Sequence, residues 1–61
     1  MDHLPINDIA MLVSSINFLL RDGEFEDLDR ICEYFGETRE NIDRLLESGG
    51  YVYNVEQNRV I

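Results

Sequence analysis

The first third of the chain carries an apolar residue every three or four positions, which is the spacing of one face of an α-helix. Asn7 is a candidate N-cap, because its side chain can accept hydrogen bonds from free amides of the first turn, and Asp8 is favourable beside the positive end of the helix dipole. The pattern predicts a helix from Asn7 to about Asp22, with Gly23 as its stop, since glycine readily adopts the left-handed conformation that closes helices. The residues expected to face the core are Ile9, Leu12, Val13, Ile16, Leu19 and Leu20.

A second stripe lies on the opposite side of this predicted helix. Two large apolar residues flank two small ones at helical spacing, and the four are Met11, Ser14, Ser15 and Phe18. One interpretation is that the N-terminal arm or the C-terminal hairpin covers Met11 and Phe18. The other is a dimer interface, because small residues let a second helix approach closely while the large ones fill the space beside it. Such a contact would extend the limited core that 61 residues can form.

Two shorter helices are predicted downstream. One runs from Glu26 to Phe35 and ends at Gly36, and the next follows the capping residue Thr38 and ends near Ser48. Their apolar residues recur at helical spacing, which identifies the side chains expected to point inward: Leu28, Ile31, Cys32, Phe35, Ile42, Leu45 and Leu46.

The C-terminal residues predict a short hairpin. Gly49 and Gly50 stop the third helix, Tyr51 to Tyr53 have strand propensity, and Asn58 suits the left-handed position of a turn before residues 59–61. The predicted fold is mainly α: a three-helix, helix-turn-helix-like bundle with a short C-terminal β-hairpin. We expect a single small domain over residues 1–61, with an N-terminal arm at 1–6, three helices within 7–50 and the hairpin at 51–61.

This outline is that of a winged nucleic-acid-binding module, but the charge argues against that role. The chain has 13 acidic residues, five arginines and no lysine, for a net charge of −8. Proteins that bind phosphate use lysine and arginine to displace counterions. On the predicted third helix, Arg39 and Arg44 are offset by neighbouring acids, namely Glu40, Asp43 and Glu47. DNA binding is therefore the least favoured of the binding functions, and we expect no nucleic-acid partner.

Catalytic, metal-binding and membrane functions have little support in the sequence. His3 is the only histidine and Cys32 the only cysteine, and Cys32 falls on a predicted core face, where a thiol is usually inert. The acids between Asp22 and Asp29 lack the spacing and the glycine of a calcium loop. No apolar run approaches the roughly 20 residues of a membrane span. We expect no enzymatic activity, no cofactor, no metal site, no membrane contact and a cytoplasmic location.

A set of residues spread over the chain resembles a known family. They are Leu4, Pro5, Asp8, Met11, Leu12, Asn17, Leu20, Arg21, Asp22, Leu28, Asp29, Cys32, Gly50, Tyr51, Val52, Tyr53 and Asn58. With its Leu-Arg-Asp and Gly-Tyr-x-Tyr motifs at this spacing, the chain is similar to the bacterial domain-of-unknown-function family 4250. The resemblance implies a short bacterial protein complete in itself, and it implies no activity. The chain departs from the family pattern at Ile9, usually proline, and at Glu26, usually a serine-like cap, so the second helix is expected to fray at its start.

The arginine of the Leu-Arg-Asp motif is expected to be a structural tie. Arg21 lies near the negative end of the helix dipole, and its guanidinium can hold a carboxylate or the hairpin backbone. The alternative is a ligand site.

The sequence favours a protein-interaction module that self-associates, as a dimer, through Met11, Ser14, Ser15 and Phe18. A second hypothesis rests on an acidic edge in which six acids surround Arg30: Asp22, Glu24, Glu26, Asp27, Asp29 and Glu33. Carboxylates in a row can imitate phosphates, so this edge would make the protein a decoy for a basic, nucleic-acid-binding partner. We favour the simpler interpretation of the edge, a solvated surface that keeps a small protein soluble.

Overall fold

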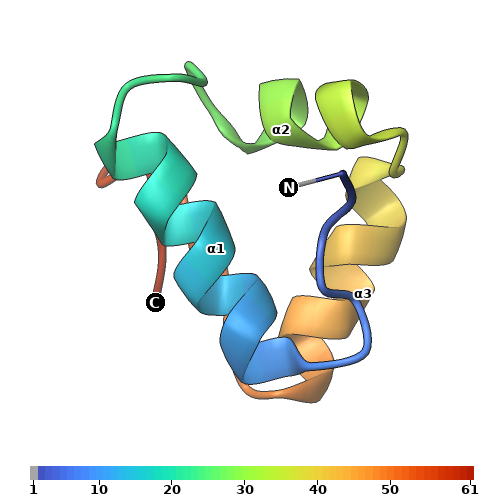
Figure 1. The fold of residues 1–61 in the computed structure, drawn as a ribbon. Helices are drawn as coiled ribbons and strands as arrows, with labels where there is room; N and C mark the ends of the chain where they lie inside the picture. Colours follow the sequence, from blue (N-terminus) through green and yellow to red (C-terminus); the bar gives the residue numbers. More distant parts are fainter. Residues whose placement is uncertain (1) are drawn as a thin grey trace.

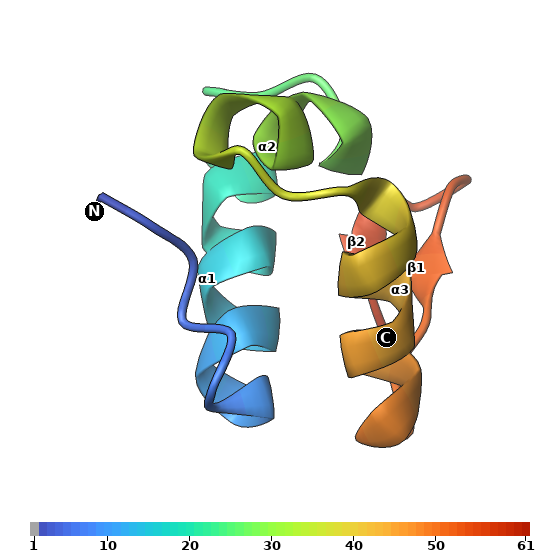
Figure 2. The same cartoon turned by 90° about the vertical axis from the view of Figure 1, so that its right-hand side faces the viewer.

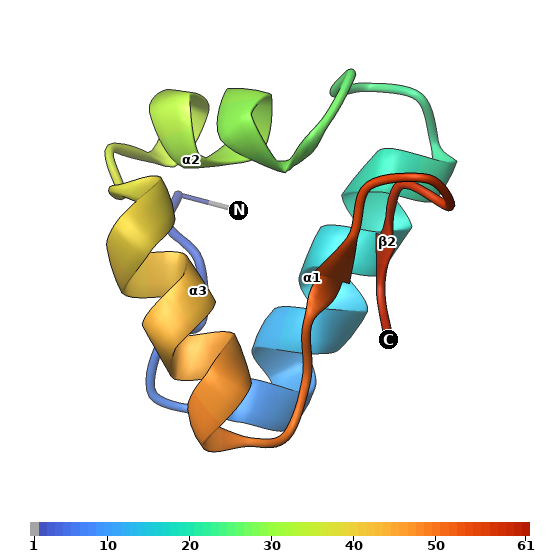
Figure 3. The ribbon, with the colours of Figure 1, turned by 180° about the vertical axis from the view of Figure 1, so that it is seen from behind.

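The computed structural model describes residues 2–61 and contains three helices followed by a two-stranded hairpin. The helices are α1 (Ile9–Arg21), α2 (Leu28–Phe35) and α3 (Arg39–Ser48), and the strands are β1 (Tyr53–Asn54) and β2 (Arg59–Val60). α1 and α3 form two sides of the molecule, and α2 crosses the same end of both (Figure 1, Figure 2). The arm before α1 and the hairpin lie on opposite faces of this frame (Figure 3). The predicted mainly helical fold with a C-terminal hairpin is confirmed.

The first and third helices begin at side chains that accept a hydrogen bond from the first turn. The carboxylate of Asp8 accepts from the Met11 amide at 3.1 Å, and the hydroxyl of Thr38 accepts from the Asn41 amide at 3.1 Å. The Thr38 cap is the predicted one. The predicted cap at Asn7 is wrong by one residue, because Asp8 is the residue whose extended backbone directly precedes α1 and whose carboxylate therefore meets the Met11 amide.

The second helix is shorter than the sequence pattern predicts. It begins at Leu28 and not at Glu26, because the carboxylate of Asp27 accepts a hydrogen bond from the Arg30 amide at 3.0 Å and caps the helix there. The start of α2 is therefore capped, in contrast to the fraying expected from Glu26. Gly36 ends the helix with a φ of 73°, as its left-handed preference predicts.

The core contains side chains from the arm, all three helices and the hairpin. Its buried members are Leu4, Leu12, Ile16, Leu19, Leu20, Leu28, Ile31, Cys32, Ile42, Leu46 and Val60. All the helical members were expected from the sequence, whereas Leu4 was expected only in an arm. Four further residues expected to face the core are only partly buried, namely Ile9, Val13, Phe35 and Leu45. Leu4 and Val60 are each 2% exposed. The arm and the hairpin thus close opposite faces of the three-helix frame.

The hairpin is attached to α1 by a side chain that takes the place of a third strand. β1 and β2 pair antiparallel with Tyr53 opposite Val60, and Val52 and Ile61 exchange two backbone hydrogen bonds at 3.0 and 2.9 Å. In this register the N–H and C=O of Val60 point away from β1. The carboxamide of Asn17 satisfies both: its oxygen accepts from the Val60 amide at 2.7 Å, and its nitrogen donates to the Val60 carbonyl at 3.0 Å.

The turn of the hairpin is fixed by Asn58, which adopts the predicted left-handed conformation with a φ of 52°. Its side-chain oxygen accepts a hydrogen bond from the hydroxyl of Tyr53, and its amide nitrogen donates to the carbonyl of Glu26 at 3.1 Å. β1 begins at Tyr53, two residues later than predicted, because the amide of Tyr51 donates to the Leu46 carbonyl at 2.9 Å and closes the end of α3.

Replacing Gly49 with alanine should lower the free energy of unfolding by about 1–3 kcal/mol, measured by urea denaturation. A Cβ at this position would lie 2.6 Å from Cγ2 of Ile9 and 3.3 Å from Cδ2 of Tyr51, so it would push against the start of α1. The backbone itself is no obstacle, because the φ of Gly49 is −100°. Combined with Ile9→Ala, which removes the clashing carbon, the same change should cost much less, and an equal cost in both backgrounds would contradict this steric reason.

Candidate interaction surface

The outer face of α1, formed by Met11, Ser14, Ser15 and Phe18, is open to solvent. Met11 is 56% exposed and Phe18 50%, so neither the arm nor the hairpin covers them. Ser14 is exposed between them, whereas Ser15 is half-buried at the margin of the face. Ala10 is also exposed and lies four residues before Ser14; the same helical spacing identifies it, although the sequence analysis did not include it.

The outer face is held on a rigid element. The opposite side of α1 buries four leucine and isoleucine side chains in the core, and Asn17 on its flank is hydrogen-bonded to β2. A helix anchored in this way has a fixed backbone, so binding at its outer face would cost little backbone entropy.

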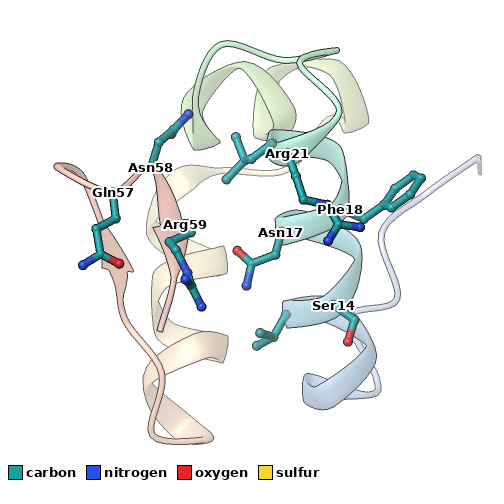
Figure 4. A pocket seen from close by; sticks show the side chains of 9 residues that line it. Ser14, Asn17, Phe18, Arg21, Gln57, Asn58 and Arg59 are labelled. Carbon is teal, nitrogen blue, oxygen red and sulfur yellow. The ribbon is translucent and has the colours of Figure 1, made fainter.

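A groove of about 810 Å³ lies beside the outer face, between α1 and the hairpin (Figure 4). Its lining includes Ser14, Phe18 and Arg21 from α1, and Gln57, Asn58 and Arg59 from the hairpin. Ser14 and Phe18 therefore belong to both the groove and the outer face. The sequence offers no local signal for this groove, because its two walls are separated by more than thirty residues of chain.

The groove is basic in a strongly acidic protein. None of the acids of residues 2–61 lines it, while two of the five arginines of the chain do. Within residues 2–61 the guanidinium groups of Arg21 and Arg59 form no ion pair and no hydrogen bond, so the structural tie expected of Arg21 is not formed. Figure 4 shows the two arginines on either side of Asn17. Two unpaired guanidinium groups can donate hydrogen bonds to a carboxylate of an incoming partner.

Half of the acidic edge is already paired with arginine. Asp27 and Glu33 lie 3.8 and 3.5 Å from Arg30, and Asp29 lies 2.9 Å from Arg39. These pairs are exposed, so each contributes at most about 1 kcal/mol to stability, but they interrupt any continuous row of free carboxylates. The members of the edge that form no ion pair within residues 2–61 are Asp22, Glu24 and Glu26, all of them exposed.

The first arginine of α3 is engaged within the fold. Arg39 donates to the carboxylates of Asp29 at 2.9 Å and Asp43 at 3.0 Å, and its guanidinium lies 4.9 Å from the centre of the Tyr53 ring. Burial lowers the pKa of Arg39, but its hydrogen bonds to Asp43 and Asp29 outweigh that effect and raise the pKa above its usual value. Arg39 therefore links α2, α3 and the hairpin. Arg44 is the other arginine of α3, and it is exposed.

Reactive side chains lie away from these surfaces. Cys32 is 3% exposed, and burial raises the pKa of its thiol to about 11, so the thiol stays protonated at neutral pH. His3 is exposed in the arm. Across residues 2–61 no group of three or more histidine, cysteine or acidic side chains is placed to hold a metal ion. The same stretch has no helix with the length and apolar character needed to cross a membrane.

The molecule is thus a small, mainly helical protein with an exposed apolar helix face beside a basic groove. Residues 6–60 match the family described as "Domain of unknown function (DUF4250)", and the chain belongs to this family. The family assignment made from the sequence is confirmed. No curated protein and no solved structure matches the chain. Three residues that carry the resemblance, Asn17, Tyr53 and Asn58, fix the hairpin beside α1.

Proposed function

We propose that this protein is an interaction module that forms a dimer through the outer face of α1. The observation that carries the proposal is the exposure of Met11 and Phe18, 56% and 50%, on a helix that is held rigidly from its other side. Large apolar side chains exposed together on one face of a helix are typical of interaction sites. The small residues between them allow the backbone of a second helix to come close.

A second copy of the chain suits this face because the face is self-complementary. Met11 and Phe18 lie at equal distances along α1 from Ser14 and Ser15. A two-fold axis through the middle of the face therefore places the large side chains of each copy beside the large side chains of the other, and the small residues face one another. The four residues of the face carry no charge that would have to be desolvated.

The expected dimer is weak. Covering the exposed half of one phenylalanine or methionine contributes about 1 kcal/mol, and a symmetric pair covers four such side chains. One helix face is also smaller than the roughly 800 Å² per partner of a standard interface. Together these contributions amount to about 4 kcal/mol, so we expect a dissociation constant in the high micromolar to millimolar range.

The other functions considered have less support. As a decoy, the protein would need a row of free carboxylates, and half of the acidic edge is paired with Arg30 and Arg39. As a DNA-binding protein it would need basic side chains on α3, where Arg39 is held by two carboxylates. We accordingly propose a cytoplasmic binding protein without catalytic activity, cofactor or nucleic-acid partner.

Changing Phe18 to glutamate should raise the dissociation constant of the dimer by about 100-fold or more. Each dimer loses two apolar contacts and acquires two charges that must be desolvated, which together exceeds the roughly 2.8 kcal/mol that corresponds to 100-fold. Sedimentation equilibrium from about 10 μM to about 1 mM covers the expected range. Circular dichroism should show an unchanged fold, because the side chain at position 18 already faces solvent.

The matched control is Val55→Glu, which introduces the same charge at a 74% exposed apolar residue in the hairpin turn. It should leave the dissociation constant within about twofold of the wild type. A wild-type protein that stays monomeric at about 1 mM would refute the proposed dimer, and equal losses from both variants would refute its location. Added salt should strengthen the dimer, because it screens the repulsion between two chains of charge −8. Binding of a basic partner by the acidic edge would weaken with salt.

A further inference from the structure

We propose that two copies pair with their α1 helices antiparallel, so that Asp8 of each copy enters the basic groove of the other and meets Arg21. This inference rests on the proposed dimer. It adds the orientation and the register of the two helices, and an ion pair between Asp8 of one copy and Arg21 of the other. With Ser14 and Ser15 at the centre, Met11 of one copy meets Phe18 of the second, and Asp8 meets Arg21.

The charges at the two ends of α1 favour this orientation. Asp8 lies at the N-terminal end, exposed and bonded to the Met11 amide, and Arg21 lies at the C-terminal end, exposed and without an ion pair within residues 2–61. The two residues are thirteen positions apart, which is about 20 Å along a helix. A parallel pair would bring the two Asp8 carboxylates together at one end and the two acidic edges, which begin at Asp22, together at the other, whereas an antiparallel pair lets Asp8 of each copy face Arg21 of the other.

The position of the acidic edge favours the same orientation. The edge starts at Asp22, immediately after α1, and its free acids lie in the segment that leads to α2. In a parallel pair the two edges would be neighbours. In an antiparallel pair they lie at opposite ends of the interface, about 20 Å apart, which exceeds the screening length of roughly 8 Å at physiological ionic strength. The antiparallel pair thus keeps the two acidic edges apart, and these edges are the largest source of repulsion between two chains of charge −8.

The groove supplies the space for the incoming end of α1. It opens beside Ser14 and Phe18, on the C-terminal half of the outer face, and it contains Arg59 as a second cation opposite Arg21 (Figure 4). The matching part of the second copy is the start of α1, where Asp8 is exposed and Ile6 is 37% exposed. In the proposed pair, the acidic and partly apolar start of α1 in one copy therefore meets the basic groove of the other, which Phe18 lines with an apolar side chain.

A cross-linking experiment distinguishes the two orientations. Asn7→Cys and Asp22→Cys place thiols just beyond the two ends of α1, about 22 Å apart in one chain. One variant is labelled with ¹⁵N, the two are mixed in equal amounts, and a short bis-maleimide is added. The antiparallel pair predicts a mixed product joining position 7 to position 22, with little product from either variant alone. The wild type is the control for Cys32, which is 3% exposed and should not react.

Products from either variant alone, without the mixed one, would overturn the antiparallel orientation. So would a dimer seen by sedimentation that gives no cross-link at either end. A monomer by sedimentation would instead refute the proposed dimer itself, so the two failures are distinguishable.

The ion pair has its own test, a double-mutant cycle of Arg21→Gln and Asp8→Asn. Asparagine caps a helix as well as aspartate, so Asp8→Asn removes the charge and keeps the cap. Each change removes both copies of the ion pair in the symmetric dimer, so it should raise the dissociation constant about two- to thirtyfold, and the two changes together should raise it no further. Effects that multiply in the double variant would contradict a direct contact between the two residues.

Discussion

Replacing Asn17 with leucine should lower the free energy of unfolding by about 2–4 kcal/mol. The change keeps the size of the side chain and removes the two hydrogen bonds that hold Val60, at 2.7 and 3.0 Å. Each bond contributes about 1 kcal/mol, and an unsatisfied N–H or C=O at a residue that is 2% exposed adds a further cost. For a chain of 61 residues, whose stability is expected to be roughly 3–9 kcal/mol, this is a large fraction. Urea denaturation measures it.

Asn17→Asp tests the two hydrogen bonds of the carboxamide one at a time, because it keeps the acceptor and removes the donor. An ionised carboxylate still accepts from the Val60 amide, but it faces the Val60 carbonyl without a donor. Protonation at low pH restores an O–H donor, so the loss of stability relative to the wild type should shrink as the pH falls and grow as it rises. A loss below about 1 kcal/mol for Asn17→Leu, with unchanged hydrogen exchange at the Val60 amide, would show that the hairpin is held in another way.

Replacing Ile16 with alanine should lower the free energy of unfolding by about 2–5 kcal/mol and leave the protein largely unfolded at moderate temperature. Ile16 is 0% exposed and lies in the middle of α1, whose buried side contacts both other helices and β2. A small core has few other groups that can move into the cavity. A thermal melt followed by circular dichroism gives the size of the effect.

Two control substitutions test whether the loss of stability comes from the buried side of α1. Ile16→Val removes one methylene and should cost about 0.5–1.5 kcal/mol, while Ser14→Ala, on the outer face of the same helix, should stay within about 0.5 kcal/mol of the wild type. Similar losses at positions 14 and 16 would contradict the division of α1 into a structural side and a binding side.

The sequence was informative where the relevant physics is local. The helical spacing of Leu12, Ile16, Leu19 and Leu20 identified the buried side of α1, and the left-handed preference of Gly36 and Asn58 located two turns correctly. Helix starts were less certain, because neighbouring polar residues compete for the cap. Asn7 and Asp8 are both good caps, and only the backbone geometry decides which side chain reaches the Met11 amide.

The features that were missed depend on contacts between distant parts of the chain. Asn17 bonds to Val60 across 43 residues, and no local pattern marks an asparagine that will complete a strand edge. The basic groove has the same origin, because Arg21 and Arg59 come to line one groove only after the hairpin has folded against α1. The outer face of α1 was identifiable from helical spacing, whereas its exposure depended on where the arm and the hairpin came to lie.

The two sides of α1 differ in what they contact. The inner side holds the fold together through the core and through Asn17, and the outer side, with Met11 and Phe18 half-exposed, forms the proposed dimer surface. The hairpin connects the two roles, because it buries Val60 and also forms one wall of the basic groove. Changes that detach the hairpin should therefore weaken both folding and association.

The proposed interface can be located most directly on the unmodified protein by NMR during dilution from about 1 mM to about 10 μM. If two copies meet through the outer face of α1, the methyl group of Met11 and the ring of Phe18 will shift as the protein is diluted, while Tyr34 and Val55, which are 71% and 74% exposed elsewhere, will not. Constant resonances at Met11 and Phe18, or shifts confined to Tyr34 or Val55, would contradict the proposal.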